Sequence, residues 1–263
     1  MTSLFSDAEI QAVLHVTPDS LAEYSGIIDV PDNNQTDEVK AMFLDRQIAI
    51  LQRQQHTESE KLYCAFAAKY LPEAVAAFKA QLEAYCPPMV VINVVTTTPY
   101  FIRFSRLPGG RDLAAIMASK VAAIPLDRTD IQEDIAAAIG QFLATLLAVQ
   151  GVESVSGEDR EKVLKLFRKW SNKFSGSFAE ETLGRCIDGF EGESIMQQMM
   201  AGMREMLSKP VEECGAPRCE KRHDPGTTNL MQCGKCKTAV YCSPQHQKLA
   251  WKKHKQLCYP TAF

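Results

Sequence analysis

The side chains best suited to chemistry in this 263-residue chain are cysteines and histidines close to its C-terminus. Thiolate and imidazole are the usual ligands of structural zinc sites, which are four-coordinate and tetrahedral. Eight such residues predict two zinc ions, each held by three cysteines and one histidine. They occur as four pairs: Cys214 and Cys219, Cys233 and Cys236, Cys242 and His246, and His254 and Cys258.

We expect these pairs to form a small module over residues 211–263, with its core at 214–258. A segment of roughly fifty residues with few bulky apolar side chains cannot bury enough surface to fold alone. Metal binding would supply the missing free energy. Outside the module, Cys64, Cys86 and Cys186 have no metal-ligand spacing and are predicted to be inert thiols.

The positions of the last two pairs limit which pairs can share an ion. A serine N-cap and a first-turn proline predict a helix over 243–257. On such a helix Cys242 and His246, and likewise His254 and Cys258, are spaced at i, i+4. At 1.5 Å per residue the two pairs are about 12 Å apart, too far for one tetrahedral ion. Each must recruit an upstream pair, and spacing alone leaves two pairings open.

The order of motifs resembles the MYND-type zinc finger. The resemblance covers about 214–258 and rests on Cys-x4-Cys, Cys-Gly-Lys-Cys and Tyr-Cys-Ser, followed by Gln247, Trp251, His254-Lys255 and Cys258. The interleaved pairing of that family implies two ligand sets. They are Cys214, Cys219, Cys242 and His246 for one zinc, and Cys233, Cys236, His254 and Cys258 for the other.

Two features depart from the family pattern. The first pair is spaced x4 where many members have x2, a change that a loop absorbs. His246 occupies a position that is usually cysteine, and we expect it to replace the thiolate because histidine also binds zinc. The rival for this ligand position is His223, which we interpret as a loop residue.

The resemblance also implies a binding surface. MYND fingers bind short proline-containing peptides in a shallow groove, and the family's groove residues match Gln247 and Trp251. These two are spaced at i, i+4, so they share one helix face. Tryptophan offers a rigid apolar surface and glutamine can hydrogen-bond a peptide backbone. The alternative is that Trp251 forms the core of the module.

Residues 1–208 are predicted to form an α-helical domain whose role the sequence does not reveal. Its fold class is mainly α, either a helical bundle or an irregular α-solenoid. Apolar residues recur at helical spacing in seven segments. They are Thr36–Leu51, Ser59–Leu82, 111–122, 130–149, 157–173, 178–188 and 193–207.

Two stretches of this domain are ambiguous. The β-branched run Val90–Val95 resembles a strand without partner strands, or else the start of a buried helix. Five methionines share one broad face of the segment 193–207, which predicts packing in the core or against the module. An adaptable peptide-binding surface is the alternative. They are Met196, Met199, Met200, Met203 and Met206.

Charge divides the chain at the same point as the cysteines. Residues 1–213 carry 20 Lys and Arg against 30 Asp and Glu, and residues 214–263 carry 9 against 2. A basic module on an acidic domain can approach anionic partners or complement the domain itself. Nucleic-acid binding through the basic module is therefore an alternative function.

The leading hypothesis is a non-enzymatic, zinc-dependent adaptor that recruits proline-containing segments of partner proteins, in transcriptional or ubiquitin-related regulation. No catalytic motif is recognisable. Some MYND fingers occur in SET-domain methyltransferases, but no Asn-His dipeptide of their active-site motif occurs in this chain. The chain has no long apolar segment and its N-terminus lacks a basic, then apolar, leader pattern. We therefore expect an intracellular protein of the cytoplasm, the nucleus or both, without a membrane partner.

Overall fold

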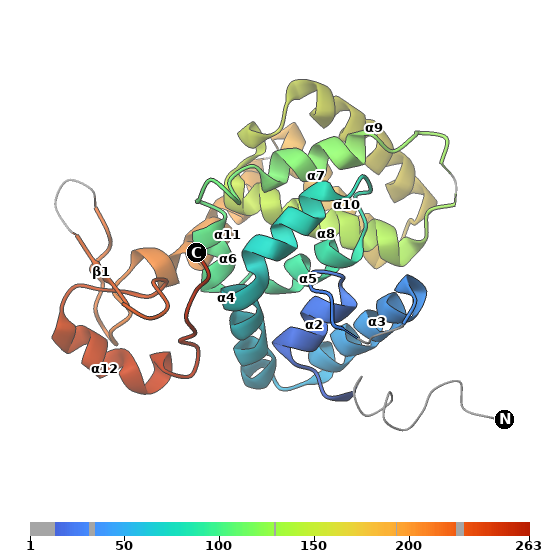
Figure 1. Ribbon diagram of the computed structural model, residues 1–263. Coiled ribbons are helices and arrows are strands. Elements are labelled where there is room, and N and C mark those ends of the chain that lie inside the picture. Colours follow the sequence, from blue (N-terminus) through green and yellow to red (C-terminus); the bar gives the residue numbers. More distant parts are fainter. Residues whose placement is uncertain (1–13, 32–34, 129, 193, 225–228) are drawn as a thin grey trace.

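Helices account for most of the chain. The computed structural model describes residues 14–31, 35–128, 130–192, 194–224 and 229–263, and this part is mainly α-helical (Figure 1). The helices up to residue 212 are α2 (Pro18–Tyr24), α3 (Asp37–Arg53), α4 (His56–Ala80), α5 (Pro87–Val95), α6 (Pro99–Phe104), α7 (Leu113–Ala122), α8 (Glu133–Gln150), α9 (Gly157–Lys173), α10 (Phe178–Glu191) and α11 (Ser194–Glu212), with a 3-10 turn at Val152–Ser154. We call residues 14–212 the body. The N-terminal residues 1–13, on which the expectation about a leader rests, lie outside the described residues.

Side-chain caps explain several helix starts. The Thr36 hydroxyl accepts a hydrogen bond from the Val39 amide at 3.4 Å and caps α3, as the sequence predicts. Ser156 caps α9, whose bounds coincide with the predicted segment 157–173. The predicted start at Ser59 is wrong, because α4 begins at His56 and the buried Ser59 hydroxyl donates to the His56 carbonyl. Leu82 lies beyond the end of α4 and is exposed.

The β-branched run Val90–Val95 is helical, so of its two interpretations the buried helix is correct. Two prolines occupy the first turn of α5, and Val91, Ile92 and Val95 are fully buried. Their burial outweighs the weak intrinsic preference of β-branched residues for strands. Helix α6, which the sequence did not predict, is buried on nearly every side and so shows no amphipathic period.

Helix α8 is the centre of the body. It contacts α5, α7, α10 and α11. A Cβ atom at Gly140 would lie 2.9 Å from the Thr182 hydroxyl of α10, so only glycine permits this close approach of α8 and α10. The Phe78 and Phe142 rings, with centroids 5.9 Å apart, connect α4 to α8.

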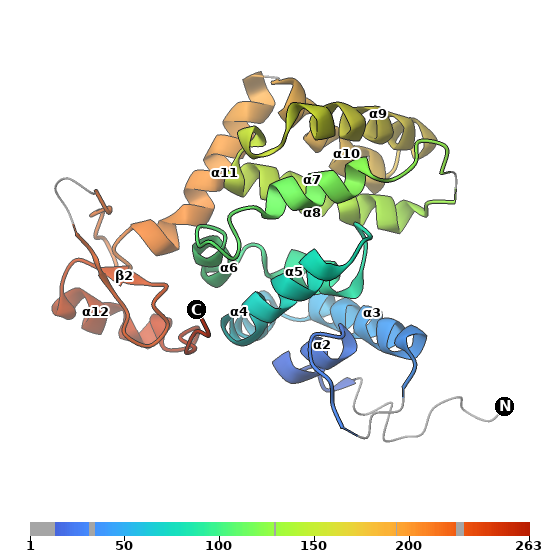
Figure 2. The same cartoon turned by 45° about the horizontal axis from the view of Figure 1, so that its top comes forward.

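The body is a bundle and not an open solenoid. In a solenoid each unit contacts only its neighbours along the chain. Here α11 returns to contact α6, and α5 contacts α8 (Figure 2). Among the described residues, no helix has both the length and the apolar character needed to cross a bilayer.

The methionine face of α11 divides into two parts. Met200 and Met203 pack against the core, as predicted, whereas Met199 and Met206 are each 61% exposed. The prediction of packing is therefore wrong for these last two methionines, which are mostly exposed to solvent, although Met199 also lines a shallow pocket with Ala144 of α8 and Arg185 of α10.

The chain after α11 folds as a small unit beside the body. It contains a two-stranded antiparallel sheet, β1 (Met231–Gln232) with β2 (Val240–Tyr241), and the helix α12 (Pro244–His254) (Figure 1). The predicted boundary between 208 and 211 falls within α11, which runs as one helix to Glu212. The unit therefore begins directly at the end of a body helix.

Two sets of contacts join this unit to the body. At the start of the unit, Glu212, the last residue of the body, accepts from Arg106 of the body at 2.7 Å and from Arg222 of the unit at 3.1 Å. Burial opposes ionisation of Glu212, but the two guanidinium groups outweigh it and lower the pKa of the carboxyl. At its end, the tail (residues 257–263) returns to the body, where the Phe263 ring lies 5.0 Å from that of Phe104.

Tyr100 is the main polar anchor of the tail. Its hydroxyl donates to the Leu257 carbonyl at 2.7 Å and accepts from the Tyr259 amide at 2.8 Å, and its side chain is 1% exposed. The Ala262 amide adds a bond to the Ala68 carbonyl at 3.0 Å. The tail is thus fixed to α4 and α6 by both backbone and side-chain hydrogen bonds.

We expect Tyr100→Phe to destabilise the protein by about 1–3 kcal/mol, because it leaves the Leu257 carbonyl and the Tyr259 amide without partners in a buried place. Chemical denaturation of the zinc-loaded protein measures this change. Tyr63→Phe is the matched control, because the half-buried Tyr63 hydroxyl has no hydrogen-bond partner among the described residues. Equal losses for the two variants would show that the Tyr100 hydroxyl does not anchor the tail.

Candidate metal centre

Backbone pairing positions the cysteines of the C-terminal unit. The Cys233 amide donates to the Ala239 carbonyl at 2.8 Å, which places Cys233 and Cys236 in the turn between β1 and β2. The loop that bears Cys214 lies along β2, where the Gly215 amide donates to the Val240 carbonyl at 2.9 Å. Cys242 follows β2 directly.

Helix α12 carries one histidine near each end. The Ser243 hydroxyl accepts from the His246 amide at 3.2 Å, and a proline occupies the first turn, so the predicted start is confirmed. The helix ends at His254 and not near residue 257. The pair His254 and Cys258 therefore spans the end of α12 and does not share one helix face.

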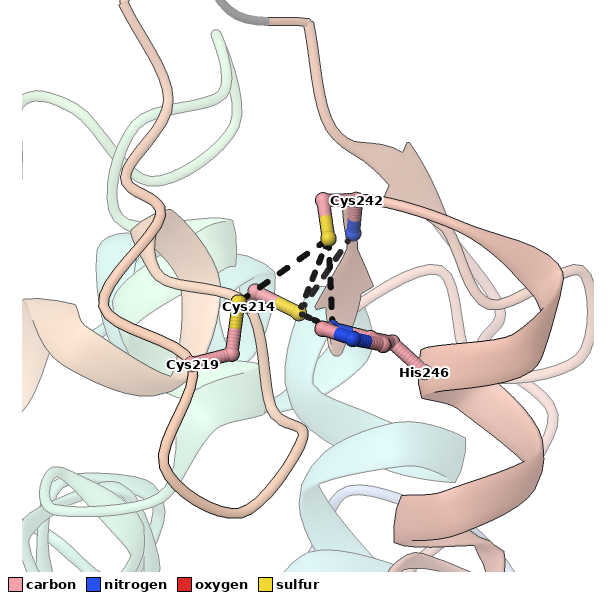
Figure 3. A group of neighbouring side chains, drawn as sticks. All are labelled: Cys214, Cys219, Cys242 and His246. Carbon is pink, nitrogen blue, oxygen red and sulfur yellow. Dashed lines mark hydrogen bonds between the residues drawn. The ribbon is translucent and has the colours of Figure 1, made fainter.

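The first cluster contains Cys214, Cys219, Cys242 and His246, whose side chains point toward one another (Figure 3). The His246 Nδ1 atom lies 3.4 Å from the Cys214 Sγ and 3.2 Å from the Cys242 Sγ. The Cys242 Sγ lies 3.8 Å from that of Cys214 and 3.9 Å from that of Cys219. Three separate segments thus meet at one point: a loop, the end of β2 and the first turn of α12.

The second cluster contains Cys233, Cys236, His254 and Cys258. The Sγ atoms of Cys233 and Cys258 are 3.8 Å apart, and the Cys236 Sγ lies 3.6 Å from the His254 Nε2. All three cysteines of this cluster are buried. These are the two metal-ligand groups found among the described residues, and they match the interleaved ligand sets that the family resemblance implies.

The spacings fit a tetrahedral zinc ion in both clusters. With Zn–S bonds near 2.3 Å and Zn–N bonds near 2.0–2.1 Å, tetrahedral geometry places two sulfurs about 3.8 Å apart and a sulfur and a nitrogen about 3.6 Å apart. The observed sulfur–sulfur distances are 3.8–3.9 Å and the sulfur–nitrogen distances 3.2–3.6 Å. Each cluster can therefore hold one zinc ion.

The first cluster is already arranged to favour a thiolate. Burial opposes ionisation of Cys214, but the backbone amides of Ala216 and Cys242 and the side chain of His246 outweigh it and lower the pKa of this thiol to about 6. Burial and the neighbouring Cys214 thiol raise the pKa of Cys242. A second negative charge is therefore unfavourable here unless a cation compensates it.

In the second cluster, too, burial and neighbouring thiols oppose the formation of a second thiolate. Burial and the nearby Cys236 and Cys233 thiols raise the pKa of Cys258 to about 12. The pKa of Cys233 is lowered, because hydrogen bonds from the Cys236 amide and His254 outweigh its burial. A bound dication would stabilise all the thiolates of a cluster at once, which accords with zinc as the group that these residues hold.

The remaining cysteines and His223 lie outside both clusters. Cys64, Cys86 and Cys186 are buried, and burial raises the pKa of each thiol. His223 is exposed, and its backbone amide donates to the Glu212 carbonyl. His246, not His223, therefore lies with the three cysteines of the first cluster.

Gln247 and Trp251 line an open hollow of about 370 Å³ on α12, together with Pro244 and Lys248. Trp251 is 44% exposed, and its ring centroid lies 5.8 Å from that of His254. The buried aromatic residue of the unit is instead Tyr241, which is 1% exposed. The structure thus gives the core position to Tyr241 and leaves part of the Trp251 ring accessible.

Comparison with known proteins agrees with this geometry. Residues 213–258 match the family model described as the MYND finger. The chain therefore carries a MYND-type zinc finger after its helical body, and we call residues 213–258 the finger.

Two curated proteins show a short similarity to the chain. Egl nine homolog 1 of Mus musculus is 50% identical over 30 residues, which are 11% of this chain and 8% of that protein. Egl nine homolog 1 of Homo sapiens is 47% identical over 30 residues, 11% of this chain and 7% of that protein. The chain thus spans less than a tenth of the length of these relatives. No solved structure matches the chain.

Sequence reasoning missed the residues that fix the finger to the body. Tyr100 lies in α6, which carries no amphipathic signal, and its partners are backbone atoms more than 150 positions away. Arg106 is one of many charged residues, and only the fold shows that it reaches Glu212. No local pattern in the sequence identifies either contact.

Proposed function

We propose that this protein is a non-enzymatic, zinc-dependent adaptor whose finger binds proline-containing segments of other proteins in the hollow on α12. The observation that carries the proposal is the exposed Trp251 ring beside Gln247 in that hollow. A partly exposed tryptophan beside a polar side chain suits a peptide that presents a proline ring and a backbone carbonyl.

The metal clusters would hold this surface in shape. His246 lies in the first turn of α12 and His254 is its last residue, so each end of the helix belongs to a different cluster. A helix fixed at both ends loses little conformational freedom when a peptide binds, which favours affinity. The surface therefore depends on zinc although no ligand lines the hollow.

The body would present the finger in a fixed orientation. The Glu212 contacts and the Tyr100 hydrogen bonds join the two at opposite ends of the finger. We place the protein inside the cell, in the cytoplasm or the nucleus, where thiols stay reduced and available to zinc.

A second candidate is nucleic-acid binding, which the charge of the finger favours. Helix α12 and its C-cap residue contain no acidic residue but four exposed lysines: Lys248, Lys252, Lys253 and Lys255. Such binding is predominantly electrostatic and weakens steeply with salt. Retention of a fluorescent DNA or RNA oligonucleotide at physiological salt would favour this function.

Trp251→Ala is expected to weaken binding of a proline-containing peptide by about 30-fold or more, as for aromatic residues at the centre of an interface. The measurement is a peptide array followed by fluorescence anisotropy with the intact, zinc-loaded protein. Leu249→Ala is the matched control, because Leu249 is 67% exposed on α12 but does not line the hollow. If no proline-containing peptide binds, or if the two variants bind equally, the proposed function is wrong.

A further inference from the structure

The hollow on α12 has a basic border. Lys248 lines it directly, beside Gln247 and Trp251. Lys255 lies four positions after Trp251 and is therefore its neighbour on the helix surface. Lys252 lies four positions after Lys248 and continues the same row. All three lysines are exposed.

These lysines remain available to a partner. Among the described residues none of these three lysines has an ion-pair partner, whereas several acidic residues of the body pair with other cations. Glu212 and Glu205 face Arg222, and Glu58 pairs with Lys61 at 2.7 Å. The positive charge around the hollow is thus not neutralised by the protein itself.

The charge of the body favours a short anionic partner over a long one. Residues 1–213 carry 30 acidic against 20 basic side chains, and hydrogen bonds from Arg222 and to Leu257 fix the finger directly to them. A long polyanion such as nucleic acid would experience this repulsion along its length. In a short bound peptide, the residues beside the Trp251 anchor lie within roughly one Debye length of the lysines, about 8 Å at physiological salt, where the attraction of the lysines dominates.

We infer that the partner segment is acidic: a proline-containing peptide with aspartate or glutamate residues beside the anchor that contacts Trp251, paired with Lys248 and Lys255. This inference rests on the proposed function and names the chemistry of its partner. Complementary charge beside an apolar anchor would also select among proline-containing segments and speed their association.

The test is an array of twelve-residue peptides that all have a central proline and vary at every other position, probed with the intact zinc-loaded protein. We expect the bound peptides to be enriched in aspartate and glutamate. For the best binder, Lys248→Gln is expected to weaken binding about threefold and Lys248→Glu about tenfold at low salt. Both losses should shrink as salt rises, because exposed charges are screened.

Lys165→Glu is the matched control, because Lys165 is an exposed lysine on α9, far from α12, and the substitution changes the net charge equally (Figure 1). Equal effects of Lys165→Glu and Lys248→Glu would overturn the inference, as would bound peptides that are neutral or basic. Binding of a twenty-nucleotide oligonucleotide, lost in Lys248→Glu while no peptide binds, would replace it with nucleic-acid binding. If Trp251→Ala alone abolishes peptide binding and the bound peptides show no preference for acidic residues, the proposed function stands and this inference is wrong.

Discussion

Removal of both zinc ions is expected to unfold residues 213–258 and to destabilise the helical body as well. The finger has a small apolar core, in which Tyr241, Val240 and Leu230 are the largest buried side chains besides the cysteines. Structural zinc sites contribute about 10–16 kcal/mol to the folding of finger peptides, far more than so small a core can supply. Without metal, the crowded thiols of each cluster lose the cation that holds them together.

The tail would transmit this loss to the body. Cys258, a residue of the second cluster, is flanked by Leu257 and Tyr259, whose backbone groups bond to Tyr100. When the cluster opens, the tail is no longer fixed at Cys258, and ordering it on α4 and α6 costs more conformational entropy. The packing of the tail around Tyr100 and Phe104 should therefore become less stable when the finger unfolds.

Hydrogen exchange measures both parts of this prediction. After chelation, the amides of residues 231–258 should lose nearly all protection, and those of Tyr259 and Ala262 should follow. The melting temperature of the body should fall by roughly 2–4 °C for each kcal/mol lost. α9 serves as an internal reference, because it packs on α7 and α10 and lies on the side of the body away from α12 (Figure 1). Unchanged exchange at Tyr259 and Ala262 would show that zinc does not stabilise the tail.

The sequence predicted the metal centre better than the fold around it. Ligand type and spacing are local, so the four pairs and the N-cap at Ser243 could be identified from short segments. The same holds for α9, whose charged and apolar faces alternate strongly and whose first turn is capped by Ser156. The pairing of the clusters was not local, and the family resemblance implied it where spacing left two solutions.

The elements that the sequence left ambiguous or missed have different physical causes, of which burial is one. In α5 and α6 no residue is fully exposed, so the alternation that identifies an amphipathic helix is weak. The start of α4 has no side-chain cap, so Ser59 was a better candidate than the residue that the fold selects. The contacts that join body and finger depend on distant partners and could come only from the structure.

Substitution of His246 is expected to remove zinc from the first cluster and to leave it in the second. His246→Ala removes the imidazole that lies within 3.4 Å of two cysteine sulfurs, and it leaves the first cluster with three ligands. Because the loss of even an outer hydrogen bond costs zinc sites 10–100-fold in affinity, we expect the loss of a direct ligand to cost more than about 100-fold. The second cluster, which shares no residue with the first, should keep its ion.

Native mass spectrometry in the presence of a competing chelator measures this effect as a change from two zinc ions to one. His246→Cys should restore the second ion, because it supplies the thiolate that is usual at this position of the family and can close the tetrahedron. His223→Ala should leave two ions bound, since the exposed His223 belongs to neither cluster. Two ions in His246→Ala but one in His223→Ala would reverse the assignment. If every variant loses both ions together, the clusters fold as one cooperative unit, and the ligand role of His246 must be read from the rate of zinc release.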